Sequence, residues 1–250
     1  MERASPRPPA PQGTIVTPGA DSTIRVMTWN IHGAFGRNPR FDLGRVVALI
    51  ERHRPDVVAL QEIDSRRPRA ASVTEPFTAL LTALGTHGVA AKSITTQDGE
   101  YGQALISRWP IENAEIHDIS YHEREPRRAV RCEIVAPCGR LRVIATHLGL
   151  SVNERRGQAD TLLRLIGDSA LTTVVLGDFN DWFWVGSVRK VLSNRMPARS
   201  RQRTFPSFLP LFRFDRVYCS PASRLVSSHT DGDARALSDH LPVICDIRPA

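Results

Sequence analysis

The segment VVLGDFND, residues 174–181, decides how the rest of this sequence is interpreted. Its first three residues are apolar and rich in valine, which is typical of a short strand buried on both faces. A glycine follows, and Asp178, Asn180 and Asp181 come where the strand would end. Gly, Asp and Asn are also ordinary turn residues, so the segment alone is equally compatible with a simple polar turn. The remainder of the chain distinguishes these two interpretations.

Several other strand-like segments also end in, or lie beside, a polar residue. These segments are 23–31, 56–62, 140–147, 214–219 and 242–247; the remaining strand-like segments are 103–107, 129–135 and 172–177, the last of which is the strand of VVLGDFND. The polar residues are Asn30, Glu62, His147, Asp178, Asn180, Asp215, Asp239 and His240. Each one alone could be a cap, a solvated strand end or a satisfied core histidine. Ligands of layered α/β folds bind along one edge of the sheet, so the repeated pattern predicts one site there.

Helical patterns separate several of the strands. Leu43, Val46, Val47 and Ile50 have the spacing of one buried helix face, and 75–85 and 153–168 are similar. The sequence APCGR between two strands predicts a hairpin, and therefore mixed sheets within an α/β fold.

One domain is expected at residues 23–250. The preceding tail, residues 1–22, holds five prolines without the apolar core of a secretory signal and is expected to be disordered. No apolar run approaches the roughly 18 residues of a membrane span, and a cytoplasmic location is the default expectation.

The polar residues suggest metal chemistry. Carboxylate and amide oxygens suit Mg²⁺ or Mn²⁺, and the four cysteines show no paired spacing for zinc. Histidines can transfer protons near neutral pH. The chain lacks a GxSxG elbow, a Walker loop and a GxGxxG motif, which excludes the commonest serine hydrolase, P-loop and dinucleotide classes. Metal-assisted hydrolysis of a phosphoester remains.

The positive charge is concentrated in one segment. The chain has a net charge of +7, and residues 184–216 hold eight basic residues and one acid, so the remaining residues sum to zero. Such a stretch suits nucleic acid or an anionic lipid surface, although a solvated loop is an alternative. The expected substrate contacts are Arg128, Arg199, Arg201, Arg203 and Trp182. Arg66, Arg67 and Arg69 are further candidate phosphate contacts, and Phe183 and Trp184 further stacking surfaces.

The order of motifs resembles that of the endonuclease/exonuclease/phosphatase superfamily over roughly residues 23–248. The motifs are MTWNIHG, VVALQEID, YGQALISRWPI, IATHLGL, VVLGDFND, FDRVY and LSDHLPVI. The chain looks most like small bacterial members described only as metal-dependent hydrolases. The resemblance implies a four-layered α/β sandwich, in which two mixed β-sheets pack face to face and helices flank them. It also implies a metal site at one end.

The resemblance further implies roles for individual residues. Glu62 would be the principal metal ligand, with Asn30 and Asp239 beside it, and Asp178 would orient or deprotonate the attacking water. Asn180 would hold a phosphate oxygen or a second metal, and His147 would assist the leaving group. His240, oriented by Asp215, would stabilise the developing negative charge. Gln103 stands where members commonly have asparagine, so its reach differs.

The expected activity is in-line attack of water on a phosphodiester, with Mg²⁺ or Mn²⁺ as cofactor and nucleic acid as the first substrate class. The alternatives are a phospholipid phosphodiesterase of the sphingomyelinase type and a phosphatase of a small soluble phosphoester. A non-catalytic binding protein is a fourth possibility. A monomer is expected, bound to nucleic acid or another phosphate-rich substrate, with peripheral contact to an anionic membrane as a further option.

Overall fold

Two mixed six-stranded sheets form the centre of the molecule in the computed structural model, which describes residues 23–34, 42–66, 75–182 and 187–250. The first sheet has the order β11-β12-β1-β2-β4-β3 and the second β5-β6-β7-β8-β10-β9. The first comprises β1 (Ile24–Asn30), β2 (Val57–Asp64), β3 (His87–Thr96), β4 (Gly99–Ser107), β11 (Leu225–His229) and β12 (Val243–Ile247). The second comprises β5 (Ile111–Asp118), β6 (Arg128–Ala136), β7 (Gly139–His147), β8 (Thr172–Asp178), β9 (Ala198–Arg199) and β10 (Asp215–Ser220).

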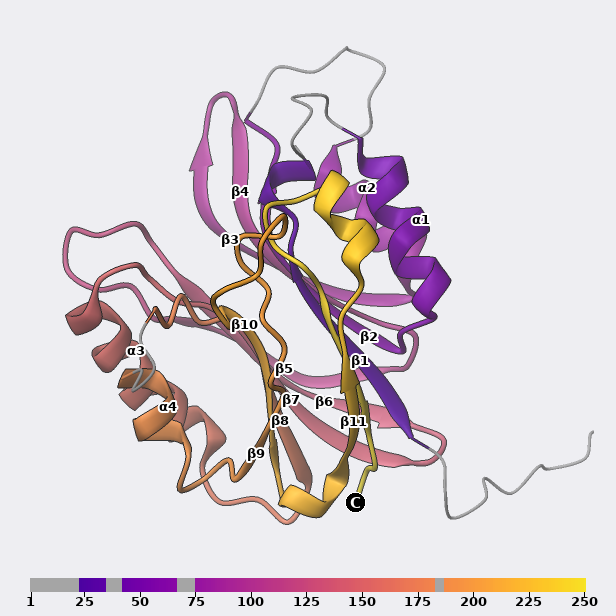
Figure 1. The fold of residues 1–250 in the computed structure, drawn as a ribbon, viewed down its shortest axis with the longest axis vertical. Coiled ribbons are helices and arrows are strands. Elements are labelled where there is room, and N and C mark those ends of the chain that lie inside the picture. The colour runs from indigo at the N-terminus through magenta and orange to yellow at the C-terminus, as the bar shows by residue number, and fades with distance from the viewer. Residues whose placement is uncertain (1–22, 35–41, 67–74, 183–186) are drawn as a thin grey trace, which may run out of the picture.

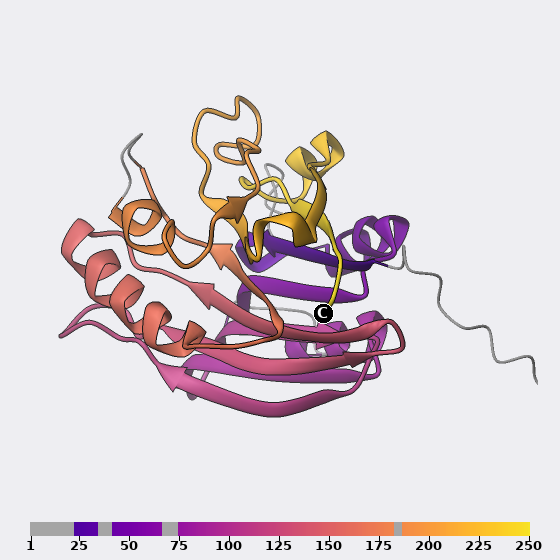
Figure 2. The ribbon, with the colours of Figure 1, turned by 90° about the horizontal axis from the view of Figure 1, so that it is seen from below.

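Helices cover the outer face of each sheet, as Figures 1 and 2 show. The first sheet carries α1 (Leu43–His53), α2 (Pro76–Leu84) and the 3₁₀-helix η3 (Gly232–Ala236), and the second carries α3 (Val152–Ile166) and α4 (Ser187–Leu192). Two further 3₁₀ turns are η1 (His32–Ala34) and η2 (Ala222–Arg224). The predicted four-layered sandwich is thus confirmed.

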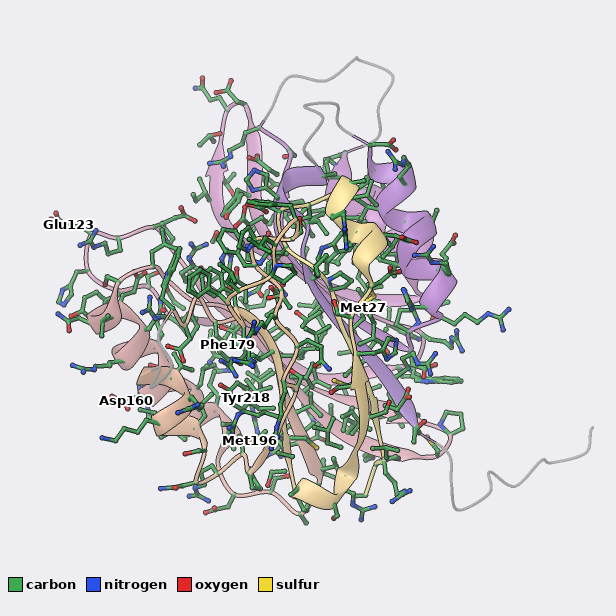
Figure 3. All side chains as sticks on the ribbon, viewed as in Figure 1. Met27, Glu123, Asp160, Phe179, Met196 and Tyr218 are labelled. Carbon is green, nitrogen blue, oxygen red and sulfur yellow. The ribbon has the colours of Figure 1, made fainter. Side chains whose placement is uncertain are left out.

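Alternation along the strands divides the core into layers. On β1, Ile24 and Val26 lie in the apolar layer between the two sheets, whereas Met27 and Trp29 pack under α1 and η3. The outer layer of the second sheet includes Phe179, Met196 and Tyr218, which lie between that sheet and its two helices (Figure 3). The rings of Phe179 and Tyr218 are 5.0 Å apart in an edge-to-face arrangement.

The glycine of VVLGDFND has a specific structural role. Gly177 has a φ of +149°, and a Cβ atom there would lie 1.9 Å from the carbonyl oxygen of Thr146. Only glycine therefore lets β8 pair this closely with its parallel neighbour β7. The pairing places His147 directly beside Asp178, so the close approach brings two polar strand ends together.

Each strand and helix expected from the sequence is present, and the APCGR hairpin joins β6 to β7. The structure adds β3, β5, β9, β11 and α4, which the sequence patterns did not indicate. The predictions for the tail and for Arg67, Arg69, Phe183 and Trp184 lie outside the described residues. Within the described part of the chain, no helix combines the length and apolar character that a bilayer crossing requires.

Candidate active site

Strand periodicity places the polar strand ends in one location. On β8, Val174 and Leu176 face the layer between the sheets, and Asp178 is the next residue on that face. Asn30 at the end of β1 and His147 at the end of β7 continue the same pattern. All three side chains therefore meet between the sheets, above the apolar layer.

Glu62 reaches the same location through a β-bulge. The register between β2 and β4 shifts between Leu60 and Ile63, and Glu62 has a φ of 56°. This left-handed conformation is unfavourable for glutamate and is typical of a functional site that the surrounding sheet holds in place. The bulge turns the Glu62 carboxylate towards the groups on β1 and β8.

Glu62, Asp178 and His147 form a compact group of polar side chains. Their ligand atoms all lie within 4.8 Å of one another. His147 Nε2 lies 3.6 Å from Asp178 Oδ2 and 3.9 Å from Glu62 Oε1. Two carboxylates this close repel each other unless a cation lies between them, and oxygen donors suit a hard divalent ion. The residues present therefore fit a divalent metal.

Asn30 joins the two carboxylates. Its Nδ2 donates to Glu62 Oε1 at 2.7 Å and to Asp178 Oδ2 at 3.0 Å. Its Oδ1 accepts from the backbone N–H of His32, and Ser238 Oγ donates to its carbonyl oxygen at 2.7 Å. Asn30 thus lies where the sequence placed it, and in this arrangement it positions the acids with its amide nitrogen.

Asp239 lies at the open side of the site, with 43% of its side chain exposed. His32 Nδ1 stands between it and Glu62, at 3.7 Å from Asp239 Oδ1 and 3.5 Å from Glu62 Oε2. Of the three expected metal ligands, Glu62 belongs to the compact group, Asn30 supports it and Asp239 is separated from it by His32. No sequence pattern indicated His32.

Asp215 and His240 form a second pair at the same site. His240 Nδ1 lies 2.8 Å from Asp215 Oδ2, and His240 Nε2 lies 3.9 Å from Asp178 Oδ2. Burial alone would lower the pKa of His240, but the negative charges of Asp215 and Asp178 outweigh burial and raise it to about 10. A protonated His240 can therefore direct an N–H towards a substrate oxygen at neutral pH.

Arg127 determines how His147 presents its ring. Arg127 Nη1 lies 3.0 Å from His147 Nδ1, and a guanidinium can only donate, so Nδ1 must accept. Burial, together with the positive charge of Arg127, lowers the pKa of His147 well below its usual range. The ring is therefore neutral with its proton on Nε2, which faces the two carboxylates. The Nε2–H of His147 is therefore a hydrogen-bond donor that points into the site.

Asn180 completes the group beside His147. It has a φ of 48°, its backbone N–H donates to Asp178 Oδ1 at 2.9 Å, and its Nδ2 donates to the Leu148 carbonyl at 2.9 Å. The Nδ2 atom also lies 3.4 Å from His147 Nε2. The contacts of Arg127 to Nδ1 and of Asn180 to Leu148 are both shorter, so they decide the tautomer. The second hydrogen of Asn180 Nδ2 therefore remains available for a substrate oxygen.

Burial raises the pKa of Asp178 to about 6, against the opposing influence of the His240 charge. Glu62 behaves differently. Burial would raise its pKa, but the hydrogen bonds from His32 and Asn30 hold it below its ordinary value. Two acids in one site therefore differ in basicity, and Asp178 is the better proton acceptor near neutral pH.

A cavity of about 600 Å³ lies beside the site and is lined with arginine. Its arginines are Arg189, Arg199, Arg201, Arg203, Arg213 and Arg216, and its other residues are Asp181, Trp182, Leu211 and Phe212. We call it the arginine cavity. It brings together four of the expected substrate contacts: Trp182, Arg199, Arg201 and Arg203. The fifth, Arg128, lies elsewhere and pairs with Asp118 at 2.8 Å.

The arginine cavity is poor in negative charge. Within the described part of the chain, none of its six arginines forms an ion pair within 4.0 Å, and Asp181 is the one acid in its lining. Several arginines elsewhere are paired: Arg25, Arg108 and Arg140 contact carboxylates at 2.8, 3.1 and 2.7 Å. Arg216 is only 7% exposed. One carboxylate, Asp181, faces six arginines, and burying cations with too few counter-ions is costly, so the cavity is suited to an external anion.

An aromatic cluster separates the arginine cavity from the catalytic groups. The ring of Trp182 packs edge-on against Phe212 and Phe214 at 5.4 and 4.6 Å. Phe205 stacks on Phe214 at 4.8 Å and also lies 4.8 Å from the ring of His240. The cavity and the site are therefore neighbours, joined by one layer of rings.

The chain belongs to the endonuclease/exonuclease/phosphatase family, whose family model matches residues 27–240. Members of this family are divalent-metal-dependent phosphoester hydrolases, and the present site has the ligands for such an ion.

The chain is also similar to individual proteins in sequence and in structure. The chain is 30% identical over 246 residues to the uncharacterized protein YbhP of Escherichia coli, covering 90% of this chain and 96% of that protein. The crystal structure of an endonuclease/exonuclease/phosphatase from Beutenbergia cavernae is similar with a TM-score of 0.73 and 25% identity, over 90% of this chain and 71% of that one. The human Nocturnin catalytic domain with bound sulfate shares the fold, with a TM-score of 0.68 and 18% identity over 91% and 94%.

Proposed function

We propose that this protein is a divalent-metal-dependent phosphodiesterase that hydrolyses its substrate by in-line attack of water on phosphorus. The observation that carries the proposal is the convergence of Glu62, Asp178 and His147 within 4.8 Å, beside the Asp215–His240 pair. A cation held by the Glu62 carboxylate, with Mg²⁺ or Mn²⁺ as the proposed ion, would neutralise phosphate oxygens and stabilise the leaving group.

The chain's own residues would then divide the proton chemistry. Asp178, whose pKa is raised to about 6, accepts a proton from the attacking water. His240 donates a hydrogen bond to a phosphoryl oxygen, and Asp215 holds the ring of His240 in orientation. The Nε2–H of His147 would donate to the leaving oxygen, and the second N–H of Asn180 Nδ2 would donate to a phosphate oxygen.

Nucleic acid is the first candidate substrate. The arginine cavity supports it because its guanidinium groups would contact phosphates beyond the scissile one, and Trp182, which is 38% exposed, would offer a ring to a base. Arg199, Arg201 and Arg203 keep the substrate-binding role in this proposal.

A phospholipid diester is the second candidate, and a specific observation favours it. Three large apolar side chains, Phe208, Leu209 and Leu211, are more than half exposed in the segment between Arg203 and Arg213, and Leu211 lines the arginine cavity. A lipid headgroup lies at an interface where apolar and cationic residues are both favourable. A small soluble phosphoester requires neither feature.

One experiment tests the function directly. Plasmid DNA, single-stranded DNA, RNA, phosphatidyl lipids and simple aryl phosphoesters are assayed in parallel with Mg²⁺, with Mn²⁺ and with EDTA. We expect hydrolysis of diesters that depends on the metal and is lost in EDTA. Full activity in EDTA would overturn the metal assignment, and cleavage of monoesters alone would overturn the diesterase assignment.

A further inference from the structure

The chain between β9 and β10 forms a hairpin at residues 204–212 whose tip is apolar and exposed. Phe208, Leu209 and Leu211 are 57%, 58% and 52% exposed, and we call these three residues the apolar tip. Figure 2 shows the orange segment between β9 and β10 extending beyond the two sheets. Single apolar side chains are common on protein surfaces, but three large ones in four positions of one projecting turn are not.

The hairpin is held rigidly. Backbone hydrogen bonds between Phe205 and Phe212 close it, with N···O distances of 3.2 and 2.8 Å. Its base is tied to the catalytic segment: Ser207 N–H donates to the Asp239 carbonyl at 2.7 Å, and Ser207 Oγ donates to the Ser238 carbonyl at 2.8 Å. The tip is thus held out into solvent by a structured base that is bonded to the active site, and its exposure is built into the fold.

Positive charge surrounds the apolar tip. Arg201 and Arg203 precede the hairpin, Arg213 follows it, and Leu211 of the tip lines the arginine cavity together with them. As described above, the cavity's arginines lack ion-pair partners among the described residues. The surface therefore combines exposed apolar side chains with uncompensated cationic ones, at a fixed distance from the catalytic groups.

This combination discriminates between two polyanions. Nucleic acid uses cations and flat rings, because its bases stack on aromatic faces. Two of the three tip residues, Leu209 and Leu211, are aliphatic and offer no ring. An anionic bilayer uses both features, since apolar side chains enter the acyl boundary while arginines remain at the headgroups. Of these two polyanions, only the bilayer accounts for the aliphatic side chains of the tip.

We propose that the apolar tip and the arginine cavity form a docking surface for an anionic lipid bilayer. Insertion of the tip would hold the Ser238–His240 segment next to the headgroup layer, because Ser207 bonds the hairpin to that segment. The docking surface concerns where the protein acts and is independent of catalysis, so it can be tested without turnover.

The test measures sedimentation with vesicles in EDTA. Sucrose-loaded vesicles of phosphatidylcholine, with and without phosphatidylglycerol, are mixed with the native chain and with the variant F208S/L209S/L211S. We expect the native chain to prefer the anionic vesicles, and the variant to lose more than about tenfold in partition coefficient. The matched control I116S/L150S/V226S removes three similarly exposed apolar side chains, which lie on β5, just before α3 and on β11. It should bind vesicles like the native chain. Circular dichroism and thermal melting confirm that each variant folds.

A fluorescent single-stranded oligonucleotide, measured by anisotropy in the same buffer, separates the two polyanions. The proposal expects the tip variant to keep its oligonucleotide affinity while losing vesicle binding. The proposal is overturned if the native chain does not bind anionic vesicles, or if the tip variant binds them as the native chain does. It is also overturned if the tip variant loses vesicle binding and oligonucleotide binding together. None of these readouts requires hydrolysis, so a failure here is distinct from a failure of the proposed phosphodiesterase.

Discussion

Asp215 begins β10 of the second sheet and His240 precedes β12 of the first, yet Asp215 Oδ2 and His240 Nδ1 lie 2.8 Å apart. The bond crosses from one sheet to the other and is fully buried. An imidazole held in this way has one orientation, so the two residues form a single functional unit.

Because Asp215 acts through His240, their losses should not add. We expect Asp215→Asn and His240→Asn each to reduce kcat by about 10²–10⁴-fold. The kcat of the double variant should be about equal to that of the slower single variant. The measurement is a double-mutant cycle of kcat on an aryl phosphodiester. A double variant that loses the product of both factors would show that the residues act independently.

The same pair should make stability depend on pH in the metal-free protein. The folded-state pKa of His240, about 10, lies above its ordinary value of 6.5. Its stabilising contribution is therefore complete below pH 6.5 and is lost as the pH rises through about 10. Urea unfolding in EDTA across this window should show a decline that is smaller in His240→Asn. An identical decline in both proteins would contradict the assignment.

Arg127 should control the tautomer of His147. Nitrogen NMR of the imidazole ring is expected to show a neutral His147 with its proton on Nε2. In Arg127→Met, the donor to Nδ1 is gone and the low pKa should rise, because the nearby positive charge is removed. We expect kcat to fall with a changed pH profile. Arg128→Met is a matched control, and a protonated Nδ1 in the native chain would refute the argument.

Glu62 should dominate metal binding. Glu62→Gln keeps the shape and the contact with Asn30 but removes one negative charge, so affinity for Mn²⁺ should fall by about tenfold or more while the fold survives. Calorimetric titration measures the affinity, and turnover should fall with it. Glu115→Gln, an exposed position on β5, is the control. An unchanged titration in Glu62→Gln would remove it from the ligand set.

The arginine cavity predicts a particular salt dependence if DNA is a substrate. Replacing Arg199, Arg201 and Arg203 by Gln should raise KM on DNA and flatten its salt slope by roughly 0.7–0.9 log units per lost phosphate contact. The rate on a minimal aryl phosphodiester should change little. The control removes the same charge from exposed positions elsewhere: R45Q/R156Q/R235Q. An unchanged slope in the cavity variant would end the electrostatic argument for a nuclease.

The sequence predicted the fold where its patterns were strong. Buried strands such as β8 gave continuous apolar runs, but β5 and β11 have no buried residues and little alternation, so local propensity did not reveal them. β9 has two residues and α4 six, which is too short for a periodic signal.

The site followed the same rule. Strand ends could be found along the chain, because periodicity fixes which face each residue takes. Arg127 and His32 act through neighbours that are distant in sequence, and no local spacing reveals such contacts. The bulge at Glu62 and the separation of Asp239 by His32 likewise depend on how two sheets meet, which only the folded structure shows.

The pairing of β12 with β1 has a consequence for biosynthesis. A nascent chain emerges with β1–β4 first and all of the second sheet next, so Glu62, His147 and Asp178 are available long before Asp239 and His240. The first sheet, however, is complete only after β11 and β12 have been synthesised and β12 has paired with β1. A ribosome-bound intermediate that ends before Asp239 would therefore carry Glu62, His147 and Asp178 without His240, and the site would be complete only after that later segment has emerged.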